Sequence, residues 1–247
     1  MIRAFGTALR TLTVLRFPGK DTRHFAASLV FFAPVGALIA ACTAGALYAI
    51  TRGAPSLGVL GALAAVTVEL LLTGGLHLDG LADVADGFGG ARERERILAI
   101  MKDPRCGSFG VAAIALDLIA RVNLYVLLAA AGELWEIFWV LTFARALQPL
   151  FLAVFPSARP DSSVAKPFAP GAGGRVAVAM AAVATLGVAG WVHGTSVMVT
   201  VMLPMAAVAG LWGLYCRERI GGITGDCIGA ANEIATVAGL TAASIYR

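Results

Sequence analysis

Three aspartates between the second and third apolar stretches of the chain are spaced for metal chemistry. Asp79, Asp83 and Asp86 occupy positions i, i+4 and i+7, which on an α-helix places them within about 60° of one another. Like charges at this spacing repel, so a purely structural helix gains nothing from them. A divalent cation such as Mg²⁺ or Mn²⁺ prefers hard oxygen ligands and would be held by these carboxylates. We therefore expect a metal site that assists phosphoryl transfer.

The surrounding residues favour a site at a membrane boundary. Apolar side chains and glycines alternate with the aspartates between residues 74 and 90, and the small residues would let a phosphate group approach the backbone. Glu69 lies about two turns inside the preceding apolar stretch, where a carboxylate is costly unless it is paired or liganded. We expect Glu69 to join the metal ligands; the alternative for the whole segment is a charged helix start at the interface.

His77 stands two residues before Asp79, on another side of a continuous helix. It could act as a base, as a hydrogen-bond donor to a phosphate or as a structural histidine, and these alternatives stay open. The candidate catalytic residues are therefore His77, Asp79, Asp83 and Asp86.

The segment after the acidic motif offers candidate phosphate contacts. It alternates in charge, is broken by Pro104, and then reads RCGSFG at 105–110. A glycine-rich turn that leads into a helix can bind phosphate through backbone N–H groups. We expect Lys102, Arg105 and Ser108 to contact a nucleotide or pyrophosphate, although an ordinary loop would explain them as well.

Several polar residues fall inside otherwise apolar stretches, where such groups normally face the bundle interior or a polar cavity. A salt bridge between Asp117 and Arg121 is the structural alternative for one pair, and Thr224 is typical of a helix N-cap. We expect Arg121, Asn123, Arg145 and Gln148 to line the site from the side opposite the carboxylates. Asp226, Asn232 and Glu233, at the start of the seventh stretch, would form a second polar wall of the same cavity. Five of these residues are expected to contact the substrates: Arg121, Asn123, Arg145, Asp226 and Asn232.

The composition indicates what must position these residues. The 247 residues are 59% hydrophobic and 14% charged, with a mean hydropathy of +0.83, which excludes a disordered, nucleic-acid-binding or disulfide-stapled protein. About 20 apolar residues cross a bilayer as a helix. Seven stretches meet this need and predict an all-α, polytopic membrane bundle: 25–50, 56–75, 109–131, 134–155, 176–192, 195–215 and 228–246. A six-helix version, with the fifth or seventh at the interface, stays open.

Basic residues indicate the orientation, because short cytoplasmic loops carry the Lys and Arg excess. Fifteen of the 19 Lys and Arg fall on one side of the predicted spans, two fall on the other side and two lie inside spans. The chain is thus expected to form a single membrane-embedded catalytic domain over 1–247, with its N-terminus and its site facing the cytoplasm. Its cytoplasmic segments would be 1–24, the acidic-motif segment 77–107, and the loops 156–175 and 216–227.

Four segments resemble the cobalamin synthase family (adenosylcobinamide-GDP ribazoletransferase). They are LRTLTVLRFP at 9–18, LLTGGLHLDGLADVADGFGG at 71–90, ILAIMKDPRCGSFG at 97–110 and GGITGDCIGAANE at 221–233. The resemblance covers essentially the whole chain, and the HLDGLAD-x-ADG core is highly specific. The first segment departs from the LTR-x-P pattern more usual in the family, and ARPDSSVAKPF at 158–168 is a looser match.

The resemblance implies a Mg²⁺-dependent transferase of cobalamin biosynthesis in the bacterial cytoplasmic (inner) membrane. Such an enzyme joins adenosylcobinamide-GDP to α-ribazole or its 5′-phosphate and releases GMP. On this basis Asp79, Asp83 and Asp86 would hold the metal, and Lys102 and Arg105 would clamp the GDP phosphates. The expected partners are these small molecules and the lipid bilayer, with no nucleic acid; a homo-oligomer stays open.

Two other functions compete with this one. The acidic motif is similar in logic to that of CDP-alcohol phosphotransferases of lipid synthesis, but it lacks their DG-x2-AR order, since Asp83 stands where the arginine would follow Ala82. A membrane transporter could also use intramembrane charges. The sequence shows no repeated pair of broken helices to support a transporter built from inverted repeats.

Overall fold

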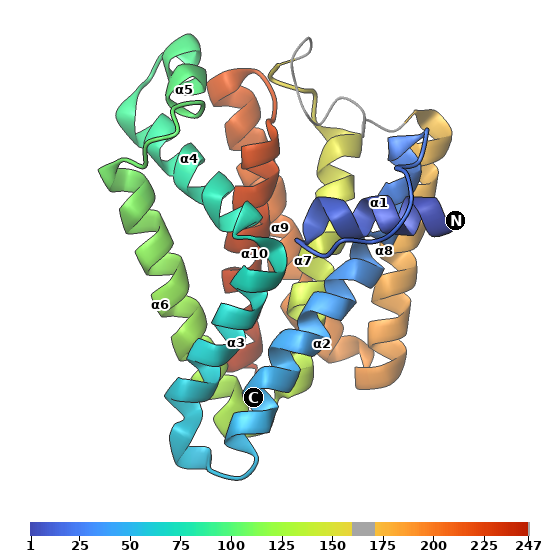
Figure 1. Ribbon diagram of the computed structural model, residues 1–247, viewed down its shortest axis with the longest axis vertical. Helices are drawn as coiled ribbons and strands as arrows, with labels where there is room; N and C mark the ends of the chain where they lie inside the picture. Colours follow the sequence, from blue (N-terminus) through green and yellow to red (C-terminus); the bar gives the residue numbers. More distant parts are fainter. Residues whose placement is uncertain (160–170, 247) are drawn as a thin grey trace.

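The computed structural model describes residues 1–159 and 171–246, and within these residues it is a bundle of helices without a β-sheet (Figure 1). A 3-10 turn, Phe25–Phe31, precedes α2, and another, Pro55–Leu57, precedes α3. The α-helices are α1 Ile2–Leu12, α2 Phe32–Thr51, α3 Gly58–Thr73, α4 Leu76–Gly90, α5 Arg94–Ile100, α6 Ser108–Ala131, α7 Leu134–Val154, α8 Ala172–His193, α9 Thr195–Ile220 and α10 Gly225–Ile245.

Seven of the described helical segments are long and apolar enough to span a membrane: α2 and α3, each with the 3-10 turn before it, and α6 to α10. Each corresponds to one of the predicted stretches, including the short fifth and the polar seventh. The seven-helix prediction is confirmed, and the chain is an all-α integral membrane protein. The seventh helix begins at Gly225, three residues earlier than predicted, so Asp226 lies in its first turn. The predicted cap is also confirmed, because the Thr224 side chain accepts a hydrogen bond from the Cys227 N–H.

The loops richest in arginine lie together at one end of the bundle, shown at the top of Figure 1. Three arginines tie these loops to one another through backbone carbonyls. Arg94 donates to Ile220 O and Ala158 O, and Arg159 and Arg219 reach back to the segment around α5. The 158–168 segment otherwise lies outside the described residues, Lys166 included.

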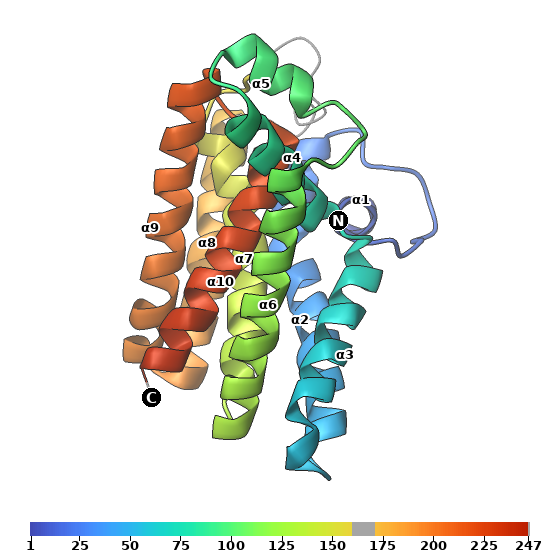
Figure 2. The same ribbon diagram turned by 90° about the vertical axis from the view of Figure 1, so that its left-hand side faces the viewer.

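Two glycines separate the acidic helix from the membrane span before it. Gly74 and Gly75 adopt left-handed backbone angles, with φ of 63° and 71°, which glycine tolerates far better than other residues. They end α3 and start α4 in a new direction. The amphipathic helix α1 lies across the bundle at this junction (Figure 2), where the Val14 N–H donates to Leu72 O at 2.8 Å.

The acidic helix α4 packs backbone to backbone against α10. A Cβ on Gly80 would come within 2.9 Å of Asp226 O, and one on Gly229 would come within 3.2 Å of His77 O. Glycine at both positions lets the two helices touch at this crossing. Two polar segments that are about 150 residues apart in the sequence are thereby brought together.

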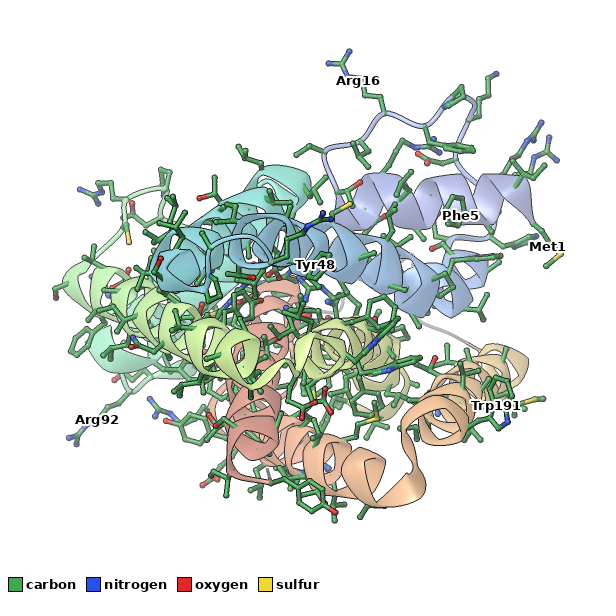
Figure 3. The ribbon with its side chains drawn as sticks, turned by 90° about the horizontal axis from the view of Figure 1, so that it is seen from below. Met1, Phe5, Arg16, Tyr48, Arg92 and Trp191 are labelled. Carbon is green, nitrogen blue, oxygen red and sulfur yellow. The ribbon has the colours of Figure 1, made fainter. Side chains whose placement is uncertain are left out.

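The perimeter of the bundle has the character of a lipid-facing surface. Trp191 is 88% exposed and Tyr48 is 50% exposed. Seen from below, Arg16, Arg92 and Trp191 project outward from the helices (Figure 3). The other charges form two groups, one buried between the helices and one on α4 and the start of α10.

Candidate active site

The acidic motif forms one continuous helix, as its spacing predicts. Asp79 is exposed at the first turn of α4, and Asp83 and Asp86 are half-buried farther along. Asp226 joins them from the first turn of α10. Burial, followed by the charges of Asp79, Asp226 and Asp86, raises the pKa of Asp83 from 3.8 to about 6, with Arg159 opposing the shift. A crowded group of carboxylates with little positive charge nearby is suited to a cation.

Asp86 also bonds to the start of α6, a contact that the sequence does not predict. Its carboxylate accepts hydrogen bonds from the Gly107 N–H at 2.6 Å and the Gly110 N–H at 2.8 Å, at the start of α6. A Cβ at either glycine would collide with the Asp86 side chain. The glycine-rich turn is predicted to offer these N–H groups to a phosphate. In the structure they bind a carboxylate of the acidic motif instead.

No three carboxylate, imidazole or thiol side chains in the described part of the chain converge closely enough to form a ready-made metal site. The donor set nevertheless suits Mg²⁺, because Asp79, Asp83 and Asp226 offer only hard oxygen ligands. Metal binding by Asp79, Asp83 and Asp86 stays a prediction.

Glu69 belongs to a separate, buried ion network. One of its carboxylate oxygens accepts from Arg145 at 2.6 Å; the other accepts from Arg121 and from the Tyr125 hydroxyl. Arg121 also donates to Glu233 at 2.6 Å and lies 3.6 Å from Asp117. All of these charged groups are at least 94% buried.

This network corrects three expectations. Glu69 is predicted to bind metal, but guanidinium groups already hold both of its oxygens. Arg121 and Arg145 are predicted to contact substrate, but each is 1% exposed and bound to Glu69. Charged residues in a membrane span need partners, and these residues pair with one another.

A chain of buried amides connects this network to the acidic helix. Asn232 donates to Glu233 Oε1 at 3.0 Å and accepts from Gln148 at 3.0 Å, and the Gln148 amide nitrogen lies 2.9 Å from His77 Nε2. His77 is 4% exposed. Burial, and then the positive charge of Arg145, lowers the pKa of His77 from 6.5 to about 3, so its imidazole is neutral.

Two hollows meet at Asp79. One, of about 360 Å³, is bordered by His77, Asp79, Gln148 and Asp226, with apolar residues from α1, α2, α7 and α10. The other, wider at about 670 Å³, lies over the α3–α4 junction and is also bordered by Asp79 and by Arg10. Each hollow can hold one molecule, and the reacting groups of the two molecules would then meet beside the carboxylate of Asp79.

Comparison with known proteins assigns the chain to a family. A family model described as cobalamin-5-phosphate synthase matches residues 4–244. The chain belongs to the cobalamin-5-phosphate synthase family. Relatives named adenosylcobinamide-GDP ribazoletransferase include those of Chlorobium phaeobacteroides (strain BS1), 40% identical over 96% of this chain and 95% of the relative, and Syntrophobacter fumaroxidans (strain DSM 10017 / MPOB), 37% identical over 97% of both. No solved structure matches the chain significantly.

In this member of the cobalamin-5-phosphate synthase family, the predicted loop contacts lie apart from the cavity lining. Lys102 and Ser108 are exposed, and Arg105 pairs with Asp103 at 2.6 Å. That pair lowers the pKa of Asp103 to about 2. Asn123 is on the exposed face of α6, where its amide donates to Ile119 O, so the expectation that it lines the site is wrong.

Two further polar residues complete the arrangement in this family member, Gln148 and Glu233. The sequence singles out both as polar residues in apolar spans, and the structure buries both, but their partners are not predictable from the sequence. The sequence also assigns Asp226 to the substrate, whereas the packing of α4 on α10 places it among the acidic residues.

Proposed function

We propose that the chain is an adenosylcobinamide-GDP ribazoletransferase, which joins adenosylcobinamide-GDP to α-ribazole or its 5′-phosphate and releases GMP. The observation that carries the proposal is the crowded carboxylate group at the meeting point of two hollows, in a chain whose family match spans residues 4–244. Relatives that are 37% and 40% identical to it carry this name.

The transfer makes one bond and breaks another at a single phosphorus. The 5′-oxygen of the nucleoside bonds to the phosphate attached to cobinamide, and the bridging oxygen leaves with GMP. Asp79, Asp83 and Asp226 would hold Mg²⁺. When bound, the ion supplies the positive charge that stabilises negative oxygens during phosphoryl transfer.

The proton of the attacking hydroxyl must go to a nearby base. His77 is poorly placed to take it, because its Nε2 is bound to Gln148 and its pKa is about 3. Asp79 and Asp226 border the smaller hollow with their carboxylates. We assign proton removal to one of these two carboxylates, with Lys102 available to contact the GDP phosphates from the exposed loop.

The site faces the cytoplasm of the bacterial inner membrane under this proposal. Support comes from the basic residues, of which all but four fall on the side of the acidic helix. These segments lie at one end of the bundle, away from the turn between α2 and α3 (Figure 1). Reporter tags at the N- and C-termini test the orientation: the N-terminal tag should be cytoplasmic and the C-terminal tag external, and two tags on one side would contradict it.

A direct assay tests the reaction. The detergent-purified protein is incubated with adenosylcobinamide-GDP, Mg²⁺ and either α-ribazole or its 5′-phosphate, and GMP and the corrinoid product are followed by mass spectrometry. We expect joining with stoichiometric GMP release. A folded sample that yields no product with either acceptor would overturn the proposal.

A further inference from the structure

The buried amide chain fixes the direction of each hydrogen bond, starting from Arg121. A guanidinium group only donates, and the carboxylate of Glu233 that it holds only accepts. Asn232 must therefore turn its NH₂ toward Glu233, which leaves its oxygen facing Gln148. Gln148 must in turn present its NH₂ to that oxygen. The charge at one end thus sets the orientation of both amides.

This order fixes the tautomer of His77. The same Gln148 NH₂ lies 2.9 Å from His77 Nε2, and an amide nitrogen cannot accept, so Nε2 must be the acceptor. A neutral imidazole that accepts at Nε2 carries its proton on Nδ1. Nδ1 is buried and has no hydrogen-bond partner among the residues that the structure describes. A buried N–H without a partner is unfavourable, so this donor is matched to something that the described residues do not supply.

The smaller hollow beside His77 has the size and lining for part of a ligand. Its volume of about 360 Å³ lies at the lower end of small-molecule sites, so it can take a bicyclic base and not a corrin macrocycle. Its polar carboxylates are Asp79 and Asp226. Most of its remaining wall is apolar: Leu12, Phe32, Leu76, Leu152 and Ile228.

We propose that this hollow takes the aromatic base of the attacking nucleoside and that the His77 Nδ1–H donates a hydrogen bond to an acceptor nitrogen of that base. This inference rests on the proposed function. Gln148 and Asn232 act as positioning residues that hold the imidazole in the required tautomer. The base of α-ribazole, an apolar bicycle with one unprotonated ring nitrogen, matches apolar walls with one donor. The wider hollow on the other side of Asp79 is left for the larger substrate.

Guanine is the competing occupant of the hollow. It carries several N–H donors as well as acceptors, and it would need partners around its whole edge. The wall away from Asp79 and Asp226 is mainly aliphatic and aromatic; apart from His77, its polar side chains are Thr11 and Gln148, and the Gln148 amide nitrogen is already bound to His77 and Asn232. It therefore provides few partners for such an edge. Binding of guanosine is therefore one arm of the test.

The first measurement is the tautomer itself, which does not depend on activity. The chain has three histidines, so ¹⁵N-histidine labelling gives a simple spectrum that His77→Phe assigns. We expect the proton on Nδ1 in the wild-type protein and on Nε2 in Gln148→Glu, because a carboxylate accepts where the amide donated. Asn123→Asp makes the same amide-to-acid exchange outside the network and should change nothing. A wild-type His77 protonated on Nε2 overturns the inference, whether or not Gln148→Glu folds.

The second measurement is binding, by calorimetry in detergent. Wild-type protein should bind α-ribazole at least tenfold more tightly than its indole analogue, in which CH replaces the acceptor nitrogen. In His77→Phe the two ligands should bind equally. Equal binding to the wild-type protein, no binding of α-ribazole, or displacement of α-ribazole by guanosine contradicts the inference. If joining activity is present in that case, the proposed function stands and the inference alone fails; if folded protein joins nothing, the function fails.

Discussion

Two groups of charged residues lie close together in this protein. One group consists of oppositely charged pairs, and the other consists of carboxylates that repel one another. In the buried ion network, Glu69, Asp117 and Glu233 face Arg121 and Arg145. In the acidic group, Asp79, Asp83 and Asp226 repel one another, and the charge of Arg159 offsets part of this repulsion at Asp83. The membrane interior forces charges to pair. The membrane boundary tolerates unpaired carboxylates, and carboxylates brought together there are available to bind a cation.

Removal of divalent cations should have the largest effect, because it acts only on the unpaired group. We expect EDTA to abolish joining and added Mg²⁺ to restore it, because the bound ion is what brings positive charge from the acidic group to the reacting phosphate. The assay is GMP release with and without chelator. Activity that survives thorough chelation would refute the assignment of the acidic group to a metal.

Asp83→Asn comes next and should separate activity from stability. We expect activity to fall by about 10²–10³-fold, the scale for removing one group that stabilises transition-state charge. The melting temperature should stay the same or rise, because the raised pKa of Asp83 shows that the fold disfavours its charge. GMP release and thermal unfolding of the same preparation measure both effects.

The pH dependence of that variant sharpens the result. A carboxylate whose folded pKa is raised from 3.8 to about 6 destabilises the fold progressively as pH rises through this window. In EDTA, the wild-type protein should therefore lose stability relative to Asp83→Asn between pH 4 and about 6. If the stability advantage of Asp83→Asn over the wild type shrinks as pH rises, the raised pKa of Asp83 is contradicted.

In the buried network, by contrast, removal of a charge should lower the stability of the fold. Glu69→Gln leaves Arg121 and Arg145 facing a neutral amide, and breaking a buried ion pair in this manner costs about 3–5 kcal/mol. We expect a large fall in melting temperature in detergent, with the lost activity following the loss of fold. Asp103→Asn, which breaks the exposed pair with Arg105, is the matched control and should melt like the wild type. Unchanged stability of Glu69→Gln with selective loss of activity would return Glu69 to the metal site.

The sequence predicts the features that are local along the chain. Hydropathy predicts all seven spans, and spacing predicts one helix for the three aspartates, because both properties repeat within a few turns. Partner choice is different: Glu69 meets Arg121 across 52 positions and Arg145 across 76. Spacing within one helix gives no information on such pairs. A costly carboxylate in a membrane span shows that a partner is needed, but not which partner it is.

The α4–α10 crossing shows a second limit. Gly80 and Gly229 allow the contact, yet glycines are common in this chain, with 29 in total, so these two do not stand out in the sequence. The crossing nevertheless moves Asp226 into the acidic group and sets His77 beside Gln148 and Asn232. Side-chain chemistry was predictable here, whereas the assignment of each residue to one of the two groups required the packing.

Asp86 is intermediate between the paired charges of the buried network and the unpaired carboxylates of the acidic group. Its substitution is expected to have the smallest effect on activity and stability. It belongs to the acidic motif by spacing, but its carboxylate holds the start of α6 through the Gly107 and Gly110 N–H groups. Asp86→Asn keeps one acceptor and turns an NH₂ toward the other N–H, so we expect a loss of about 0.5–2 kcal/mol, typical of a weakened helix cap. Activity should fall far less than in Asp83→Asn.

Gly110→Ala provides the control for this distinction, because its Cβ would displace the Asp86 carboxylate without changing any charge. If Asp86 acts through α6, the two variants should lower the melting temperature together and lose similar, small amounts of activity. If instead Asp86→Asn melts like the wild type and loses activity as Asp83→Asn does, Asp86 is a metal ligand. The contacts with Gly107 and Gly110 would then be exchanged for the cation during the reaction.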